Sequence, residues 1–354
     1  MENLPSGSYD LFAEFAGYRF TQDFINPIQI FKENVSNKDF KGFAAVKGSL
    51  TISGVVAESN GTPVSGVIVE DLDGLYQAMT DAQGQYVLNG LPSGAYVLRA
   101  TKDGQYFTPA LRTVLLRENT ANVNFMLLSQ TFMVNSTKDE EDAQLGDGIC
   151  ASASGVCTLR AALQESNASQ LPARIHLDSA IYEIELESSL RIANNLVIEG
   201  VSKNQTVITN KRNAALFEIT PLLSTPIGVT FSKMTIERSV GAAIMSAGNP
   251  AVISLEEVAI NKSTDGGIFA DYADVTLYRS EIVNNNALER SGALEVHGHA
   301  GFGMTSIVQS SIQGNEGSTG GVYTDSGILI LNSTLSNNIG RTKAGALMLD
   351  GREG

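Results

Sequence analysis

Residues 229–236 read VTFSKMTI, and a stretch of the same pattern returns four more times along the chain. The apolar position of Ile236 recurs at steps of 24, 22, 30 and 23 residues. A repeat of about 25 residues is typical of solenoid proteins, in which each unit stacks on the next. The recurring positions are Ile236, Ile260, Ile282, Ile312 and Leu335.

Other columns keep the same register. The column seven positions earlier is mostly apolar and consists of Val229, Ile253, Val275, Thr305 and Ile328. The column five positions earlier is apolar throughout and consists of Phe231, Leu255, Leu277, Ile307 and Ile330. Three positions later stands a polar column, Ser239, Ser263, Asn285, Asn315 and Asn338. A glycine column follows the turn, at Gly241, Gly267, Gly292, Gly321 and Gly345. A further apolar column comes after it, at Ile244, Ile268, Leu294, Val322 and Leu347.

Strand residues alternate between two faces, so the apolar columns are expected to point into one interior. Asn suits the turn because it tolerates left-handed φ, and stacked amides hydrogen-bond along the axis. Glycine after the turn lets neighbouring coils approach closely. The helical spacing i, i+3, i+4 is missing. The pattern therefore predicts an all-β chain with a parallel β-helix, right-handed by the general crossover preference.

Residues 48–127 have another texture, with short apolar runs separated by turns. Asn60 to Pro63 forms one turn, Gly84 suits positive φ in a second, and Leu91 to Gly94 forms a third. Residues 3–11 repeat the phrase of residues 90–98, and matching positions continue to Phe40 and Phe125. We expect a truncated half-module over 1–45 and a complete β-sandwich over 46–129.

The complete module resembles the carboxypeptidase regulatory-like modules, a transthyretin-like family related to Cna-B-type repeats. The resemblance rests on 52–55, 63–67, 80–86 and 91–96. It implies a β-sandwich that serves as a spacer or a ligand-presenting stalk. Because half a sandwich cannot bury its face, we expect that Met1 is not the native start. We likewise expect that the β-helix continues past Gly354.

Between the repeats, residues 158–166 predict a short helix. Thr158 suits the N-cap, and Leu159, Ala162 and Leu163 form one apolar stripe. Such a helix would cover the open first coil, because solenoid ends need a cap. With Asp147-Gly148, Cys150 and Cys157 to Ala162, this stretch resembles the CSLREA region of bacterial extracellular proteins, although Thr158 and Ala161 depart from its Ser and Glu. The resemblance implies secretion or surface display of a domain over 130–354.

The two cysteines, Cys150 and Cys157, have six residues between them and no histidine nearby. A zinc site would need more ligands. A local disulfide is the simplest interpretation and would imply an oxidising compartment, while a reduced pair is the alternative.

The chain has 354 residues and a formal charge of −14. This charge argues against nucleic acid or an anionic membrane as partner, since both need a basic surface. The sequence has no run of 18 apolar residues, so no membrane-spanning helix is expected. The first 30 residues do not have the pattern of a signal peptide. The oligomeric state is not predicted.

Many β-helix proteins are polysaccharide lyases or hydrolases, whose carboxylates gather on one outer face. Asp265, Asp271, Asp274 and Glu281 lie in adjacent coils, but their spacing does not pair them. We interpret them as a solvated acidic surface and assign no catalytic residue.

Two metal sites are weaker candidates. Glu295, His297 and His299 share one face of a strand in the longest coil. They could bind a transition metal, or they could equally be the polar tips of an outward loop. Asp139, Asp142 and Asp147 could hold calcium, although we favour a charged linker, because the loop lacks the ordered alternation of an EF-hand. No cofactor is expected otherwise.

The sequence therefore predicts a piece of a secreted or cell-surface bacterial protein. In this interpretation a non-catalytic β-sandwich stalk presents a β-helix for adhesion, with an extracellular glycan or protein as partner. The alternative is a polysaccharide lyase or glycoside hydrolase. Three or more carboxylate or basic groups gathered on one outer face across adjacent coils would favour the enzyme.

Overall fold

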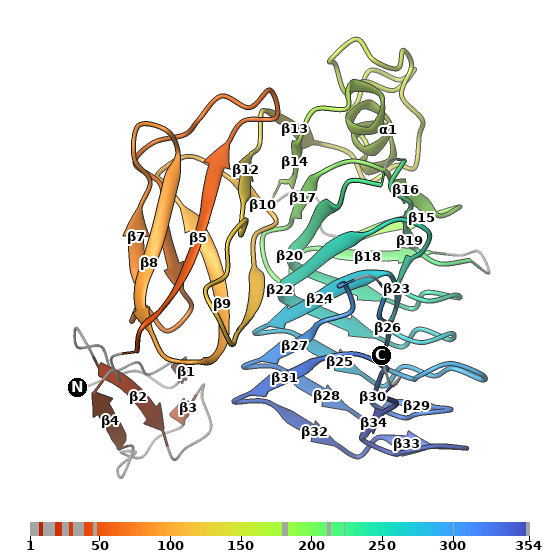
Figure 1. The fold of residues 1–354 in the computed structure, drawn as a ribbon. Coiled ribbons are helices and arrows are strands. Elements are labelled where there is room, and N and C mark those ends of the chain that lie inside the picture. The colour runs from red at the N-terminus through yellow and green to blue at the C-terminus, as the bar shows by residue number, and fades with distance from the viewer. Residues whose placement is uncertain are drawn as a thin grey trace.

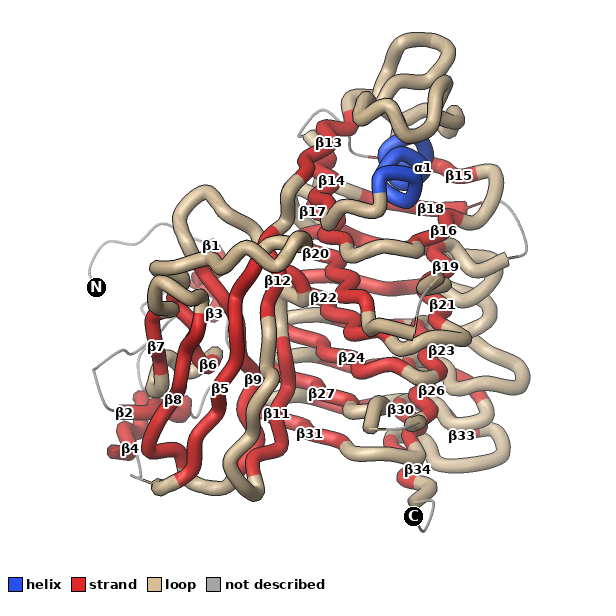
Figure 2. The backbone as a smooth tube through the Cα atoms, turned by 45° about the horizontal axis from the view of Figure 1, so that its top comes forward, coloured by secondary structure: helices blue, strands red, loops and turns tan. Residues whose placement is uncertain are grey.

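The computed structural model describes residues 7–9, 18–22, 28–30, 39–44, 48–178, 183–210, 214–222, 224–299 and 301–351. Its two largest bodies are a β-sandwich and a column of β-coils that lie side by side (Figure 1). The only helix in these ranges, α1 (Leu159–Ser169), sits at the upper end of the column (Figure 2). No helix in the described residues is both long enough and apolar enough to cross a membrane.

The module consists of two four-stranded sheets around one apolar core, as predicted. The first sheet has the order β10 (Phe107–Thr108), β12 (Phe125–Leu127), β5 (Leu50–Ala57), β8 (Gln85–Leu91). The second has the order β11 (Arg112–Leu116), β9 (Gly94–Thr101), β6 (Ile68–Asp71), β7 (Gln77–Met79). Gly84 has a φ of 70°, which only glycine adopts easily.

Four short strands precede the module: β1 (Gly7–Tyr9), β2 (Tyr18–Gln22), β3 (Ile28–Ile30) and β4 (Phe40–Ala44). Gly7 pairs with Ile30 as Gly94 pairs with Leu116. The β2–β4 pairing likewise repeats the antiparallel β10–β12 pairing. The described strands thus share the pairing of the second copy. Much of the predicted half-module, 1–45, lies outside the described residues.

The column is a parallel β-helix. Its largest sheet has the order β13 (Gln130–Val134), β14 (Ala173–Leu177), β17 (Leu196–Glu199), β20 (Ile227–Glu237), β22 (Ala251–Asn261), β24 (Ala273–Tyr278), β27 (Thr305–Val308), β31 (Ile328–Leu331). Side branches of this sheet are β15 (Glu183–Leu186), β18 (Val207–Asn210), β25 (Glu281–Val283), β28 (Ser311–Gln313) and β32 (Thr334–Ser336).

A second long sheet forms another side of the column. Its order is β16 (Leu190–Ile192), β19 (Phe217–Ile219), β21 (Ile244–Ser246), β23 (Ile268–Asp271), β26 (Leu294–His297), β30 (Val322–Thr324), β34 (Leu347–Leu349). A small sheet pairs β29 (Glu316–Gly317) with β33 (Ile339–Gly340). We call the β16–β34 sheet the far sheet, because the module packs against the other long one.

Every predicted apolar column is a ladder of paired residues. Phe231, for example, pairs with Leu255, which pairs with Leu277 and so on to Ile330. Except in the last coil, these side chains are fully buried and belong to one continuous core. Stacking thus gives each coil an interior that it could not make alone, because one coil has too little apolar surface to offset its ordering entropy.

The polar column is buried and bonded along the axis, as predicted. The side-chain oxygen of Asn315 accepts hydrogen bonds from the N–H and the amide nitrogen of Asn285, both at 3.0 Å. The prediction that these positions carry left-handed φ is wrong. Positive φ falls on the preceding, mostly exposed residues, Arg238, Lys262, Asn284, Gly314 and Asn337. The chain bends at the outer residue, so the polar side chain beside it can point inward.

The glycine column permits the close approach that its position predicts. A Cβ on Gly321 would lie 2.1 Å from the carbonyl oxygen of Ala346 in the next coil. The same atom on Gly267 would lie 2.5 Å from the oxygen of Ala293. A side chain at either position would separate two coils.

Helix α1 closes the first coil. The side chain of Thr158 accepts the N–H of Ala161 at 3.1 Å, which is the predicted N-cap. Leu159, Ala162 and Leu163 are buried in the β-helix core. The amphipathic stripe therefore has the predicted capping role.

The module packs along the β-helix rather than extending from its end (Figure 1). Val97 and Leu111 of the module form an apolar cluster with Tyr278 and Val308 of the coils. Gly228 accepts a hydrogen bond from the hydroxyl of Thr108 at 3.0 Å. The separate stalk expected from the sequence is thus a sandwich in contact with several coils.

Candidate functional site

The outward side chains of the far sheet gather into a cluster on its lower coils. Pairing of β23, β26 and β30 aligns Phe269, Glu295 and Tyr323 in one column, and Asp271 with His297 in the next. The inward neighbours of these residues are the core positions Ile268, Leu294 and Val322. The in–out alternation of the strands therefore places the cluster on the outer surface.

His297 lies at the centre of this cluster. Its Nε2 is 3.0 Å from an oxygen of Glu295, and its Nδ1 is 3.3 Å from an oxygen of Asp325. The imidazole also lies between two aromatic rings, with centroids 5.7 Å from Phe269 and 5.3 Å from Tyr323. We call Phe269, Glu295, His297, Tyr323 and Asp325 the outward strip.

Cations close both ends of the strip. The guanidinium of Arg290 lies 4.2 Å from the ring centre of Phe269, and the ammonium of Lys343 lies 4.5 Å from that of Tyr323. Such cation–π contacts are worth roughly 0.5–1 kcal/mol at exposed sites. The strip crosses three coils, and with Arg290 and Lys343 it forms a stack of rings and cations.

Hydrogen bonding controls the charges of the strip. The bond with Glu295 raises the pKa of His297 against the opposing effect of burial, and Asp325 adds to it. Burial works against ionisation of Glu295, but the bonds from His297 and from the Ser291 N–H outweigh it and lower its pKa. The protonated imidazole and the ionised carboxylate therefore stabilise each other.

A second group of aromatic side chains adjoins the strip. The ring of Tyr272 meets His299 edge-on at 5.9 Å and Phe302 at 5.5 Å. Nε2 of His299 lies 2.9 Å from an oxygen of Asp271. We call Asp271, Tyr272, His299 and Phe302 the aromatic corner.

The structure separates the predicted transition-metal ligands. Glu295 and His297 bond to each other, whereas His299 bonds to Asp271. No group of three or more His, Cys, Asp or Glu side chains in the described ranges is arranged to hold a metal ion. Metal binding at Glu295, His297 and His299 stays a prediction.

The four carboxylates considered for catalysis do not pair with one another. Asp271 belongs to the aromatic corner, while Asp274 accepts the N–H groups of Gly303 and Met304. Asp265 lies 3.7 Å from Arg290, and Glu281 pairs with Lys203.

The aromatic members of the site were not predicted. Phe269 and Tyr323 follow Ile268 and Val322 just as Glu295 follows Leu294. Because strand residues alternate between faces, each residue directly after an inward position is expected to point outward. This rule predicts outward positions for both Phe269 and Tyr323. Phe302 lies in the longest step of the repeat, 30 residues against 22 to 24 in the others, so the shorter steps contain no signal for it.

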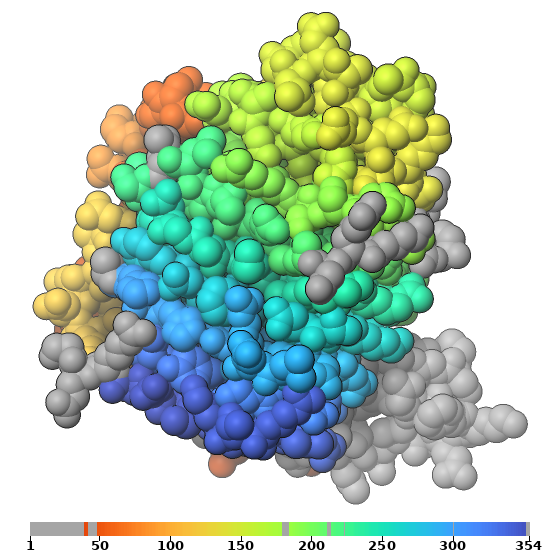
Figure 3. All heavy atoms as spheres, turned by 90° about the vertical axis from the view of Figure 1, so that its right-hand side faces the viewer, coloured from red at the N-terminus to blue at the C-terminus, as the bar shows by residue number. Residues whose placement is uncertain are grey.

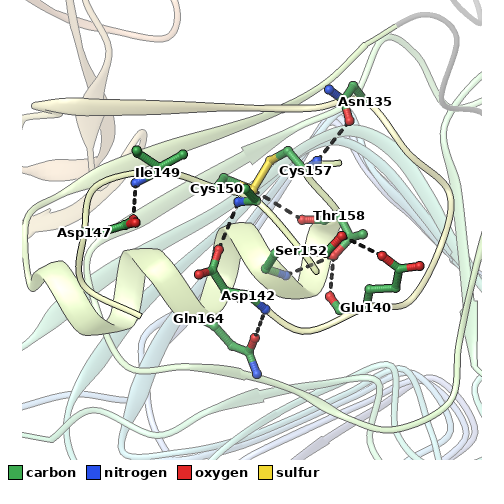
Figure 4. The surroundings of a disulfide bond; sticks show 12 residues. Asn135, Glu140, Asp142, Asp147, Ile149, Cys150, Ser152, Cys157, Thr158 and Gln164 are labelled. Atoms are coloured by element: carbon green, nitrogen blue, oxygen red, sulfur yellow. Dashed lines mark hydrogen bonds between the residues drawn. A yellow bond between two sulfur atoms is a disulfide. The ribbon is translucent and has the colours of Figure 1, made fainter. Parts of the chain in front are cut away.

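The acidic loop before α1 is an organised cap (Figure 4). Asp139 pairs with Arg160 at 2.7 Å, Asp142 accepts the N–H of Ala151 at 3.1 Å, and Asp147 accepts the N–H of Ile149 at 2.8 Å. Each proposed calcium ligand thus has a partner within the protein. Calcium binding by these three carboxylates stays a prediction.

A disulfide joins Cys150 and Cys157 in this cap, as predicted (Figure 4). The wholly buried Glu165 of α1 accepts the N–H groups of Gly146 and Gly148, both at 2.6 Å. The cap is therefore fixed by a covalent bond and by charge-assisted hydrogen bonds, which are stronger than neutral ones.

A cleft of about 790 Å³ separates the module from the upper coils. Glu199 in this cleft accepts a bond from Arg174 at 2.9 Å and one from Lys233 at 2.8 Å. The guanidinium of Arg174 also lies 4.1 Å from the ring centre of Tyr106. These three charges all belong to the β-helix and neutralise one another there, while the contact of Arg174 with Tyr106 crosses to the module.

These features define a β-sandwich docked on a capped parallel β-helix. Within it, residues 51–128 match the family model of the carboxypeptidase regulatory-like domain. This match confirms the resemblance inferred from the turn pattern of the module.

No curated protein matches the chain. Two solved cohesin–X-dockerin complexes from Acetivibrio cellulolyticus, an N-terminal and a C-terminal interface mutant of the type II complex, are similar to part of it at 15% identity. Each match covers 34% of this chain and 94% of the matched chain in the complex, with a TM-score of 0.19. Likeness of this extent supports no conclusion about this chain.

Proposed function

We propose that this chain is part of a secreted or cell-surface protein, and that its far sheet binds an extracellular glycan or protein without catalysis. The observation that carries the proposal is the joint position of the outward strip and the aromatic corner on the lower coils. Phe269, Tyr272 and Phe302 are half-buried, and such rings beside a few fixed polar groups are the usual make-up of a recognition surface.

The position of the module supports this assignment. The sandwich packs against the β20–β22–β24 side, through contacts such as that of Thr108 with Gly228. The side turned away from it is built from successive coils, from the cap to the last strand (Figure 3). In this proposal the module supports the binding face of the β-helix without covering it.

An extracellular setting has two supports. The Cys150–Cys157 disulfide is of a kind that persists in oxidising compartments. The CSLREA-like stretch from Asp147 to Ala162 forms the cap of the β-helix, as it would in a surface-displayed protein.

A lyase or hydrolase remains the second candidate, because carboxylates and imidazoles do gather on one outer face across adjacent coils. This gathering of Glu295, His297 and Asp325 favours an enzyme, whereas the charge state of Glu295 argues against a hydrolase. A glycoside hydrolase needs a carboxylic acid that stays protonated, which requires a raised pKa. The pKa of Glu295 is lowered, because its bonds with His297 and the Ser291 N–H outweigh burial.

The test is a paired measurement on the whole chain. Native gels cast with defined soluble polysaccharides, together with titration against purified extracellular matrix proteins, measure binding. Release of reducing ends and ultraviolet absorbance of unsaturated products measure turnover. We expect retarded migration or saturable binding without turnover. Turnover that Glu295→Gln abolishes would replace this proposal by the enzyme, and no binding in either assay would refute it.

A further inference from the structure

Backbone hydrogen bonds join two of the described residues that carry rings at the aromatic corner. His299 and Phe302 exchange two backbone hydrogen bonds, at 3.1 and 2.9 Å. The buried side of the turn is equally tight, since a Cβ on Gly303 would lie 2.4 Å from the Cα of Gly298. The two rings are therefore held in place before any ligand arrives.

Two carboxylates anchor this turn from the coils on either side. Asp274 accepts the N–H groups of Gly303 and Met304 at 3.0 and 2.9 Å. Asp325 accepts the N–H of Gly298 at 2.6 Å. A ligand that binds a preorganised surface of this kind loses little affinity to ordering of the protein.

The aromatic corner combines apolar rings with a carboxylate. The rings of Tyr272 and Phe302 meet at an interplanar angle of 82° and are both partly exposed. One oxygen of Asp271 holds His299, and the other receives no hydrogen bond from any residue that the structure describes. An apolar surface thus adjoins an accessible acceptor.

This combination discriminates between ligands. A purely apolar partner would strip water from the Asp271 carboxylate without replacing its hydrogen bonds, which is costly. A uronate polymer would bring its own carboxylates close to Asp271. A neutral sugar ring offers C–H groups to the aromatic rings and hydroxyl donors to the free oxygen.

We propose that the aromatic corner binds one ring of a neutral polysaccharide, through Tyr272 and Phe302 on the apolar face and Asp271 on a hydroxyl. This inference rests on the proposed function and narrows it from a glycan or protein to an uncharged glycan. It also predicts that polyuronates are poor ligands.

The test uses the whole chain and compares soluble neutral polysaccharides, a β-glucan and a galactomannan, with polygalacturonate. Affinity electrophoresis ranks them, and calorimetry gives the dissociation constant of the best. We expect a neutral polymer to bind, and Phe302→Ala to weaken its binding at least tenfold. Tyr106→Ala removes a ring of the module that is 41% exposed and contacts Arg174 rather than the corner, so it is the matched control and should bind as the parent does. Unchanged melting temperatures exclude misfolding.

The possible failures are distinguishable. Preference for polygalacturonate, or full binding by Phe302→Ala together with loss in Tyr323→Ala, overturns the corner as the subsite but leaves the proposed function standing. Absence of binding to all three polysaccharides overturns the neutral-glycan inference. The proposed function falls as well only if the matrix proteins also fail to bind.

Discussion

Replacement of Asn315 by alanine tests whether buried amide stacking holds the coils in register. Asn315 is fully buried, and its side chain makes five hydrogen bonds. Its oxygen accepts two bonds from Asn285, and its nitrogen lies 2.8 Å from the Ile282 oxygen, 3.1 Å from the Gln313 oxygen and 3.0 Å from the Asn338 side chain.

The expected loss follows from these bonds. A typical intramolecular hydrogen bond contributes about 1 kcal/mol net, and a buried partner left unsatisfied costs about 1–3 kcal/mol. Because the amide nitrogen shares two hydrogens among three acceptors, we count fewer than five full bonds. Asn315→Ala should lower the free energy of unfolding of the β-helix by about 3–5 kcal/mol.

Serine provides the control, because Ser239 and Ser263 occupy the same column in earlier coils. Asn315→Ser keeps an acceptor for the Asn285 N–H and should lose about half as much. Urea unfolding measures the total, and hydrogen exchange followed by mass spectrometry locates the loss around residues 282–315. A loss below about 1 kcal/mol in Asn315→Ala would refute the idea that this column stabilises the stack.

Three further predictions concern pH and the domain contact. Burial raises the pKa of Asp71 to about 6, so its carboxyl destabilises the folded module increasingly as pH rises from about 4 through 6. In calorimetry Asp71→Asn should be more stable than the parent at pH 8, by about 3 kcal/mol, and equal to it near pH 4; a constant difference would contradict this. The pKa of His297 is also raised, so its bonds stabilise the fold fully below pH 6.5 and lose effect as pH rises. The stability deficit of His297→Gln should therefore be about 1–2 kcal/mol at pH 6 and shrink by pH 9, and growth of the deficit with pH would disprove the bonding scheme. Leu111 is buried against Tyr278 across the domain contact, so Leu111→Ala should cost about 2–4 kcal/mol and speed proteolysis between the domains, whereas Leu115→Ala, at an exposed site of the module, should do neither.

The candidate site was only partly visible in the sequence. Alternation around Leu294 placed Glu295 and His297 on one outer face, and both are there. Their partners Asp325 and Tyr323 lie 26 or more residues away, on another coil. Coils of this protein differ in length, with steps from 22 to 30 residues. The sequence spacing alone therefore does not show which residue of the next coil lies beside Glu295 or His297.

The sequence by itself determined the inward half of this protein. The columns from Val229 to Leu347 and the Thr158 cap follow from alternation, repeat and short-range chemistry, whereas the Cys150–Cys157 bond was one of two interpretations and is present in the structure. These features are fixed because a buried position accepts few residue types, and therefore repeats visibly.

Apart from the outward position of Glu295 and His297, the tertiary structure alone decided which residues meet on the outer surface. Contact of the module with Gly228, the ring stack on His297 and the aromatic turn at Phe302 join residues that no local pattern links. Left-handed backbone on Lys262 and Arg238, rather than on the serines beside them, was decided in the same way. The physical reason is that outward side chains are constrained by the neighbouring coil and the docked module, and not by a shared interior.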